Sequence, residues 1–155
     1  MNKTADILVI DDEQVIIDAV IKICALDDYS VDYAINTKMG LEKISKNSYP
    51  IIISDIMMPD GDGFQILEAV NKYKKDSVVI MTTGFSTVEN AVNSLYKGAL
   101  SFIPKPFTVD EILSVIFRAK NYIQIMEKQK SLIKQKRNDE LLYVTCPAKY
   151  LRLGH

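Results

Sequence analysis

Three aspartates that could hold a metal ion stand directly after apolar runs of the chain. Asp11 and Asp12 follow the run at residues 7–10, and Asp55 follows the run at residues 51–54. Such runs are typical of buried parallel strands, whose carboxyl ends meet at one edge of a sheet. Carboxylates gathered there repel one another unless a hard cation lies among them. The three acids therefore predict a Mg²⁺ site with open positions for a phosphoryl group.

Two further polar residues end apolar runs and could act on a phosphoryl group. Thr83 comes after the run at residues 78–81, and Lys105 lies beyond the apolar residues 102–104. Prolines on both sides of Lys105 make a rigid setting that can aim its ammonium group at the edge of the sheet. We therefore expect a hydroxyl donor and a cation beside the acids.

With Asp11 and Asp12, Asp55, Thr83 and Lys105 in this order, the chain resembles the receiver domain of two-component response regulators. The stretch at residues 55–64, Asp-Ile-Met-Met-Pro-Asp-Gly-Asp-Gly-Phe, is similar to the loop that follows the phosphorylated aspartate in that family. The resemblance covers residues 5–124. It implies a signalling switch in which a sensor histidine kinase donates a phosphoryl group to Asp55, so that the domain modifies itself and is not a turnover enzyme.

The resemblance also assigns roles to individual residues. Asp11, Asp12 and Asp55 would hold Mg²⁺, with the carbonyl oxygen of Met57 as a further ligand, and Lys105 would bind the phosphate. Thr83 is expected to be the switch hydroxyl, in preference to Thr82, because a small residue, Gly84, follows it as the family pattern expects. When Thr83 moves inward, the ring of Phe102 could fill the vacated space and so change the surface formed by the fourth helix, the last strand and the fifth helix. The bond between Lys105 and Pro106 is expected to be cis.

Met57 and Phe85 flank the place from which water would attack an aspartyl phosphate. They lie two residues after Asp55 and Thr83, respectively. Neither side chain can orient a water molecule by hydrogen bonding. We therefore predict that the phosphorylated form decays slowly.

The spacing of apolar residues predicts the elements that position these side chains. Helical spacing favours helices over residues 14–26, 63–73 and 87–97, with another around residues 39–44. A short strand is expected at residues 31–34, and the capping box at residues 108–111 opens a fifth helix. Together they predict a flavodoxin-like α/β fold, a doubly wound parallel sheet of five strands in the order 2-1-3-4-5 with five helices. The fourth helix is expected to turn four residues inward: Val88, Ala91, Val92 and Leu95.

Composition favours one compact domain with an appendage. The chain has 155 residues, of which 48% are hydrophobic, enough for one good core. Cys24 and Cys146 lack the spacing of a zinc site or a disulfide framework, which is typical of a reducing compartment. The chain has no apolar run long enough to cross a membrane and no apolar signal peptide core. We therefore expect a cytoplasmic protein that does not bind membranes.

The charge pattern separates the receiver from its tail. Residues 1–119 carry 11 Lys and Arg against 17 Asp and Glu, whereas residues 120–155 carry 8 against 3. The acidic part suits a cation site and no direct contact with nucleic acid. The basic tail is either a solvated helix face or a surface for nucleic acid, anionic lipid or an acidic partner. We expect a receiver over residues 1–124, followed over residues 125–155 by a helical linker or by the start of an output domain.

A heptad seam in the tail could pair two chains. The fifth helix is expected to continue to about Lys136, either as a parallel dimer or as a frayed helix or linker. An output domain or an effector protein would then receive the signal. The seam consists of Ile116, Ala119, Ile123, Met126, Lys130 and Ile133.

Two other classes of function compete with the switch. A Mg²⁺-dependent phosphohydrolase of the haloacid dehalogenase kind would need a second aspartate two residues after Asp55, where this chain has Met57. A pseudo-receiver that serves only for interaction would not need all of the site residues. Phosphate release over many turnovers would identify the first class, and indifference to Asp55→Asn the second.

Overall fold

The computed structural model describes residues 4–74, 76–85 and 87–145. Five parallel strands form one sheet in the order β2-β1-β3-β6-β7, which is the predicted order 2-1-3-4-5 counted along the sheet's own strands. The strands are β1 (Ile7–Ile10), β2 (Val31–Ala34), β3 (Ile51–Asp55), β6 (Val78–Thr83) and β7 (Ser101–Pro104).

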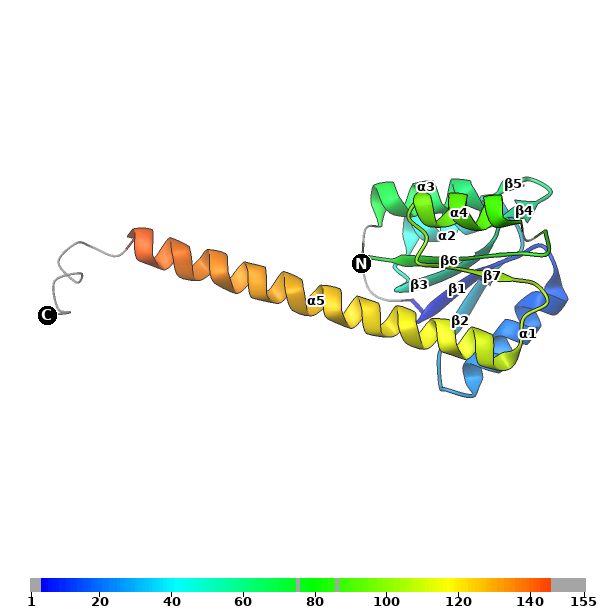
Figure 1. Ribbon diagram of the computed structural model, residues 1–155, viewed down its shortest axis with the longest axis horizontal. Coiled ribbons are helices and arrows are strands. Elements are labelled where there is room, and N and C mark those ends of the chain that lie inside the picture. The colour runs from blue at the N-terminus through cyan, green and yellow to red at the C-terminus, as the bar shows by residue number, and fades with distance from the viewer. Residues whose placement is uncertain (1–3, 75, 86, 146–155) are drawn as a thin grey trace, which may run out of the picture. The chain divides into compact units, whose positions relative to one another are not determined.

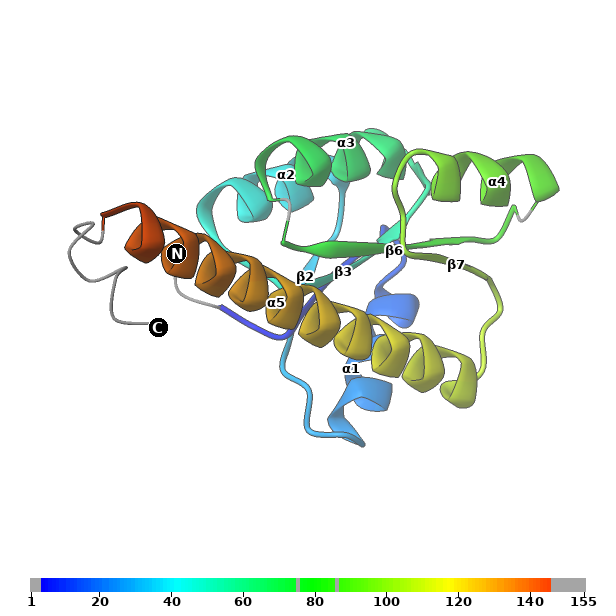
Figure 2. The same cartoon turned by 60° about the vertical axis from the view of Figure 1, so that its left-hand side comes forward.

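Helices cover both faces of the sheet, as predicted for a doubly wound fold. In Figures 1 and 2, α2, α3 and α4 lie on one face, and α1 and the first part of α5 lie on the other. The helices are α1 (Gln14–Ala25), α2 (Thr37–Lys46), α3 (Gly63–Tyr73), α4 (Val88–Tyr96) and α5 (Val109–Thr145).

Burial on both faces explains the unbroken apolar runs in the sequence. Every residue of β1, β3 and β6 is buried. Parallel strands enclosed by helices lose the polar alternation of half-exposed strands. In this register Ile10 lies opposite Ser54, and Asp55 lies opposite Thr82. The polar residues at the strand ends therefore meet at one edge.

A hairpin that the sequence did not predict follows β3. We expected a loop there, but β4 (Met57–Met58) and β5 (Gly61–Asp62) pair in antiparallel fashion. Two-residue strands lie below the length that sequence periodicity can detect, because alternation needs at least about four residues. The hairpin connects the end of β3 to the start of α3.

A side-chain cap begins the fifth helix at the predicted place. The hydroxyl of Thr108 accepts a hydrogen bond from the N–H of Glu111, whose carboxylate accepts one from the N–H of Thr108. This reciprocal pair is the predicted capping box. Gly98 follows α4 with φ of 104°, a conformation that only glycine adopts without cost.

The predicted inward face of α4 was wrong. Val88, Val92 and Leu95 are 82%, 57% and 51% exposed, and the residue of this helix that is fully buried is Ser94. Helical spacing identifies an apolar stripe but not whether the fold covers it. In this helix a small side chain contacts the rest of the domain, and the larger apolar ones form an exposed surface.

The fifth helix is longer than predicted and divides the chain. It ends at Thr145 rather than near Lys136, because the sequence between residues 108 and 145 has no proline or glycine to stop it. Contacts separate a unit of residues 1–120 from one that begins at Asn121. Ile116 and Ala119, the first two residues of the predicted seam, are fully buried in the first unit. They belong to the domain core and are not available to pair two chains.

The structure also bears on the predictions about membranes and cysteines. Among the residues that the structure describes, no helix is long and apolar enough to cross a membrane. Cys24 is a buried free thiol, and burial raises its pKa to about 12. Cys146 and the rest of residues 146–155 lie outside the described residues, so the expected start of an output domain there is untested.

Candidate functional site

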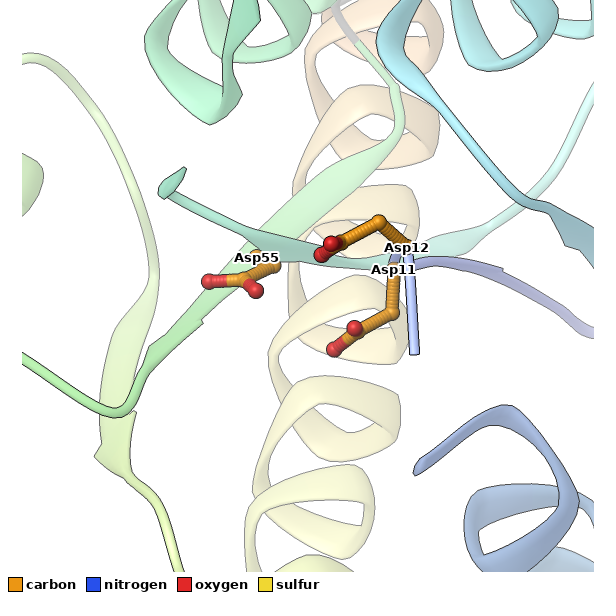
Figure 3. Close-up of side chains that lie close together, drawn as sticks. All are labelled: Asp11, Asp12 and Asp55. Carbon is orange, nitrogen blue, oxygen red and sulfur yellow. The ribbon is translucent and has the colours of Figure 1, made fainter. Parts of the chain in front are cut away.

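The three predicted acids lie together at the carboxyl edge of the sheet (Figure 3). Asp11 and Asp12 follow β1, and Asp55 is the last residue of β3. Their carboxylates offer ligand oxygens that all lie within 4.8 Å of one another. Asp11 and Asp55 are only 1% and 5% exposed, whereas Asp12 is exposed. The adjacency of β1 and β3 thus produces the cluster.

The predicted lysine reaches into the acid cluster. The backbone N–H of Lys105 donates to the carbonyl oxygen of Thr83, which holds the residue beside the end of β6. Its Nζ lies 2.7 Å from Asp11 Oδ2 and 3.0 Å from Asp55 Oδ2. The bond from Lys105 to Pro106 is cis, as expected. Lys105 therefore bridges the two buried carboxylates.

Negative charge remains in excess despite this lysine. Burial raises the pKa of Asp11 and of Asp55, and hydrogen bonds from Lys105 lower each pKa only in part. Burial by itself lowers the pKa of Lys105, but hydrogen bonds to the two carboxylates raise it above its ordinary value. A carboxyl with a raised pKa binds more protons in the folded chain than in the unfolded one, so stability falls as the pH rises through that interval. A divalent cation would relieve this cost.

The donor set fits Mg²⁺. Magnesium prefers carboxylate oxygens and keeps positions for water or phosphate oxygens. Asp11, Asp12 and Asp55 supply such oxygens from two neighbouring strands, and the exposed Asp12 leaves the cluster open to solvent.

Backbone contacts fix the orientation of Asp55. The N–H of Met57 donates to its Oδ1 at 3.3 Å, while Oδ2 faces Lys105. The N–H of Gly63 donates to the carbonyl oxygen of Ile56 at 2.7 Å, which closes the hairpin onto the end of β3. Each oxygen of the Asp55 carboxylate therefore has its own hydrogen bond donor.

The two residues expected to switch lie within the domain. Thr83 is fully buried, and its hydroxyl oxygen accepts a hydrogen bond from the N–H of Phe85 at 3.2 Å. Phe102 lies opposite Met81 in the sheet and packs, partly buried, against the core. The hydroxyl of Thr83 is thus engaged within its own loop.

Met57 and Phe85 lie on the exposed side of the site. Their side chains are 52% and 68% exposed. Both residues also have backbone N–H groups bound to site residues, Asp55 and Thr83, respectively. Both side chains are therefore open to solvent, next to residues of the site.

Sequence reasoning missed three residues that shape the site. The N–H of Glu13 donates to Asp11 Oδ1 at 2.9 Å, and its carboxylate lies 3.4 Å from Lys105 Nζ. Asp60 binds the start of α2, and Gly63 packs against the backbone of Asp55. The position of Glu13, directly after two acids, was a usable signal. The contacts of Asp60 and Gly63 depend on tertiary packing that local sequence does not report.

Comparisons with known proteins agree on one family. The family described as response regulator receiver domain matches residues 7–117. The transcriptional regulatory protein DltR of Streptococcus agalactiae is 34% identical over 128 residues, covering 83% of this chain and 54% of that protein. The response regulator ArlR of Staphylococcus haemolyticus is 32% identical over 111 residues, covering 72% of this chain and 50% of that protein. The chain spans about half the length of these relatives.

Solved structures give the same result. The beryllofluoride-activated NtrC4 receiver domain dimer has a TM-score of 0.72 and 36% identity, covering 76% of this chain and 97% of that one. NtrX from Brucella abortus has a TM-score of 0.77 and 30% identity, covering 83% of this chain and 29% of that one. At 36% and 30% identity, both structures resemble this chain in sequence as well as in fold.

Proposed function

Because the chain belongs to the receiver domain family of response regulators, we propose that it is a phosphoacceptor switch in which Asp55 receives a phosphoryl group from a sensor histidine kinase. The observation that carries this proposal is the cluster of Asp11, Asp12 and Asp55 around Lys105. We further propose that the receiver extends over residues 1–124 and that residues 125–155 are a helical linker or the start of an output domain. Effects on DNA or on an effector protein would belong to that output.

In the proposed reaction, an oxygen of Asp55 forms a bond to phosphorus while the bond from phosphorus to the donor's histidine nitrogen breaks. Asp11, Asp12 and Asp55, with the carbonyl of Met57, would hold Mg²⁺, which supplies positive charge to the transferring oxygens. The Nζ of Lys105 already contacts Asp55 Oδ2. It would bind an oxygen of the transferred phosphoryl group as a second positive charge. The contact from Met57 to Oδ1 keeps the carboxylate oriented.

Intact mass after incubation with acetyl phosphate and Mg²⁺ tests the proposal. We expect one added phosphoryl group that is absent in Asp55→Asn and absent when Mg²⁺ is chelated. A folded parent chain that gains no mass would favour an interaction-only domain. Continued release of phosphate over many turnovers would favour a phosphohydrolase.

We propose that the exposed apolar surface of α4 is where partners bind in response to phosphorylation of Asp55. Val88, Val92, Leu95 and Tyr96 of α4 are each more than half exposed, as is Phe85 in the segment that leads into α4. Exposed apolar side chains grouped on one helix are typical of a binding surface. Inward movement of Thr83 would release the N–H of Phe85 and shift the segment that leads into α4. A change at Asp55 would thus reach a surface that partners bind.

The phosphorylated form should decay slowly. We predict that Met57→Asn with Phe85→Glu shortens the lifetime of the aspartyl phosphate about tenfold, because both new side chains can orient the attacking water. The lifetime is measured by intact mass after rapid removal of the donor. Loss of the phosphoryl group from the parent within seconds, or equal lifetimes of parent and variant, would contradict this prediction.

We propose that the tail pairs two chains, but along a stripe other than the predicted seam. Tyr122, Ile125 and Leu132 are 43%, 56% and 57% exposed and lie on one side of the helix at spacings of three and seven. The beryllofluoride-activated NtrC4 receiver domain, to which this chain is similar, is a dimer. We therefore expect a second copy of this chain to cover the stripe.

Replacing Ile125 and Leu132 with aspartate should convert a dimer into a single chain, because burying paired carboxylates is costly. The matched control introduces the same aspartates at Gln124 and Ser131. These two residues are exposed and have the same spacing one position earlier. Molar mass by light scattering over a range of concentrations measures the result. A parent chain that stays monomeric at high concentration would contradict the proposed pairing.

A further inference from the structure

Asp60 connects the hairpin of β4 and β5, which follows Asp55, to the start of α2. It lies in the turn between β4 and β5. Its Oδ1 accepts a hydrogen bond from the N–H of Thr37 at 3.0 Å, and its Oδ2 accepts one from the N–H of Lys38 at 2.9 Å. These are the first two N–H groups of α2, which have no acceptor within their own helix. One carboxylate therefore caps α2 from outside it.

The cap that Asp60 provides is not duplicated by the sequence around α2. The side chain of Asn36 accepts from the N–H of Met39 at 2.7 Å, and its carbonyl oxygen accepts from Gly40. Asp60 supplies the acceptors for the two N–H groups that remain in the first turn. A carboxylate is favoured there by the positive end of the helix dipole. Accordingly, the N–H groups of Lys38 and Thr37 hold the pKa of Asp60 below its ordinary value.

Close packing accompanies these hydrogen bonds. The hydroxyl of Thr37 donates to the sulfur of Met58 at 3.8 Å, and both residues are buried. A Cβ atom added at Gly61 would lie 3.3 Å from the side chain of Thr37. The hairpin and the start of α2 therefore contact each other on both sides of Asp60.

The first residue of the same hairpin, Met57, contacts the carboxylate of Asp55, the proposed phosphoacceptor. Met57 begins β4, pairs with Asp62 and donates its N–H to Asp55 Oδ1. A ladder of two residue pairs is too short to hold its own shape. The position of the Met57 N–H therefore depends on contacts outside the hairpin, among them the two charged hydrogen bonds that Asp60 accepts from α2.

We propose that Asp60 is a positioning residue for phosphorylation: by capping α2 it holds the hairpin so that the N–H of Met57 orients the Asp55 carboxylate. This inference rests on the proposed phosphoacceptor function. It also makes the start of α2 responsive to the site, because any shift of Met57 on phosphorylation is transmitted through two charged hydrogen bonds.

The test compares Asp60→Ala and Asp60→Asn with the parent. In Asp60→Ala we expect amide hydrogen exchange of Thr37 and Lys38 to rise roughly fivefold, as loss of a helix cap implies. We expect phosphorylation of Asp55 by acetyl phosphate at saturating Mg²⁺ to slow about tenfold, because the nucleophile is less well oriented. Asp60→Asn keeps one acceptor oxygen, so its exchange and phosphorylation rates should fall between those of the parent and those of Asp60→Ala. It replaces the alanine variant if that variant does not fold.

Asp62→Ala is the matched control. Asp62 is an exposed acid of the same hairpin, and its side chain caps α3 through the N–H of Gln65 rather than α2. It should be phosphorylated at a rate within about twofold of the parent, since the Met57 N–H keeps its place. Faster exchange in Asp60→Ala with an unchanged phosphorylation rate would overturn the inference, as would equal slowing in Asp62→Ala. A parent that is not phosphorylated at all would instead contradict the proposed function, and the inference with it.

Discussion

Replacing Lys105 with methionine should lower the free energy of unfolding by about 3 kcal/mol at neutral pH, because it leaves two buried carboxylates without their cation. The Lys105 side chain is 9% exposed and lies within 3.0 Å of both Asp11 and Asp55. Urea unfolding without divalent cations measures the loss. Mg²⁺ should restore more stability to the variant than to the parent, because it supplies the missing positive charge among the same oxygens.

The loss should depend on pH in a defined direction. Burial raises the pKa of Asp11 and of Asp55 above 3.8, so the cost of burying their charges without a cation vanishes as the pH falls through those raised values and both become neutral. Burial lowers the pKa of Lys105, but hydrogen bonds to the two carboxylates raise it above its ordinary value, so Lys105 stays charged from neutral pH into acid. The difference between variant and parent should therefore be large at neutral pH and small in acid.

Lys46→Met is the matched control for Lys105. Lys46 lies 2.8 Å from Glu42, but both side chains are more than half exposed. Exposed ion pairs contribute at most about 0.5 kcal/mol at this spacing on a helix. If both variants lost the same stability, burial of the acid cluster would not be the cause.

The sheet was predictable because its physical signal is strong and local. Strands β1, β3 and β6 are buried on both faces, so their sequences are uninterrupted apolar runs that end at a polar residue. Once the strand order places β1 beside β3, Asp11 and Asp55 must meet. The site could therefore be located from residue order alone.

The errors arose where packing between elements decides the outcome. Periodicity placed Val88 and Val92 on the inward face of α4, but both are exposed and the buried residue of this helix is Ser94. The same limit applies to the seam in α5, whose first residues, Ile116 and Ala119, are used by the domain core. An apolar stripe in a sequence predicts that the surface will be buried. Only the packing of the fold shows whether it is buried within the domain or left exposed for a partner.

Asp60 and Gly63 escaped prediction for a related reason. Each acts on a residue that lies outside its own turn: Asp60 on the first turn of α2, and Gly63 on the backbone of Asp55. In the sequence both belong to a short stretch rich in glycine and aspartate, at residues 60–63. Their roles depend on which element the turn touches, so a turn next to a reacting residue should be searched for such contacts.

Replacing Gly63 with alanine should cost about 3 kcal/mol of stability. A Cβ atom there would lie 2.3 Å from the carbonyl oxygen of Asp55 and 3.0 Å from its carbonyl carbon. Alanine favours a helix over glycine by about 1 kcal/mol, but this gain is smaller than the cost of moving backbone. The start of α3 and the end of β3 would have to separate.

That separation should also displace the phosphoacceptor. Misplacement of a reacting group by about 1 Å can slow a reaction about 100-fold, so phosphorylation of Gly63→Ala should be far slower than its loss of stability alone explains. Gly84→Ala is the matched control, because nothing lies within 4 Å of the added carbon and its φ is outside the left-handed region. Unfolding by urea and the rate of mass gain with acetyl phosphate measure the two effects. Since the clash is with the Asp55 backbone itself, a Gly63→Ala chain that is destabilised but phosphorylated at the parent's rate would mean that the hairpin, and not β3, yields to the added carbon.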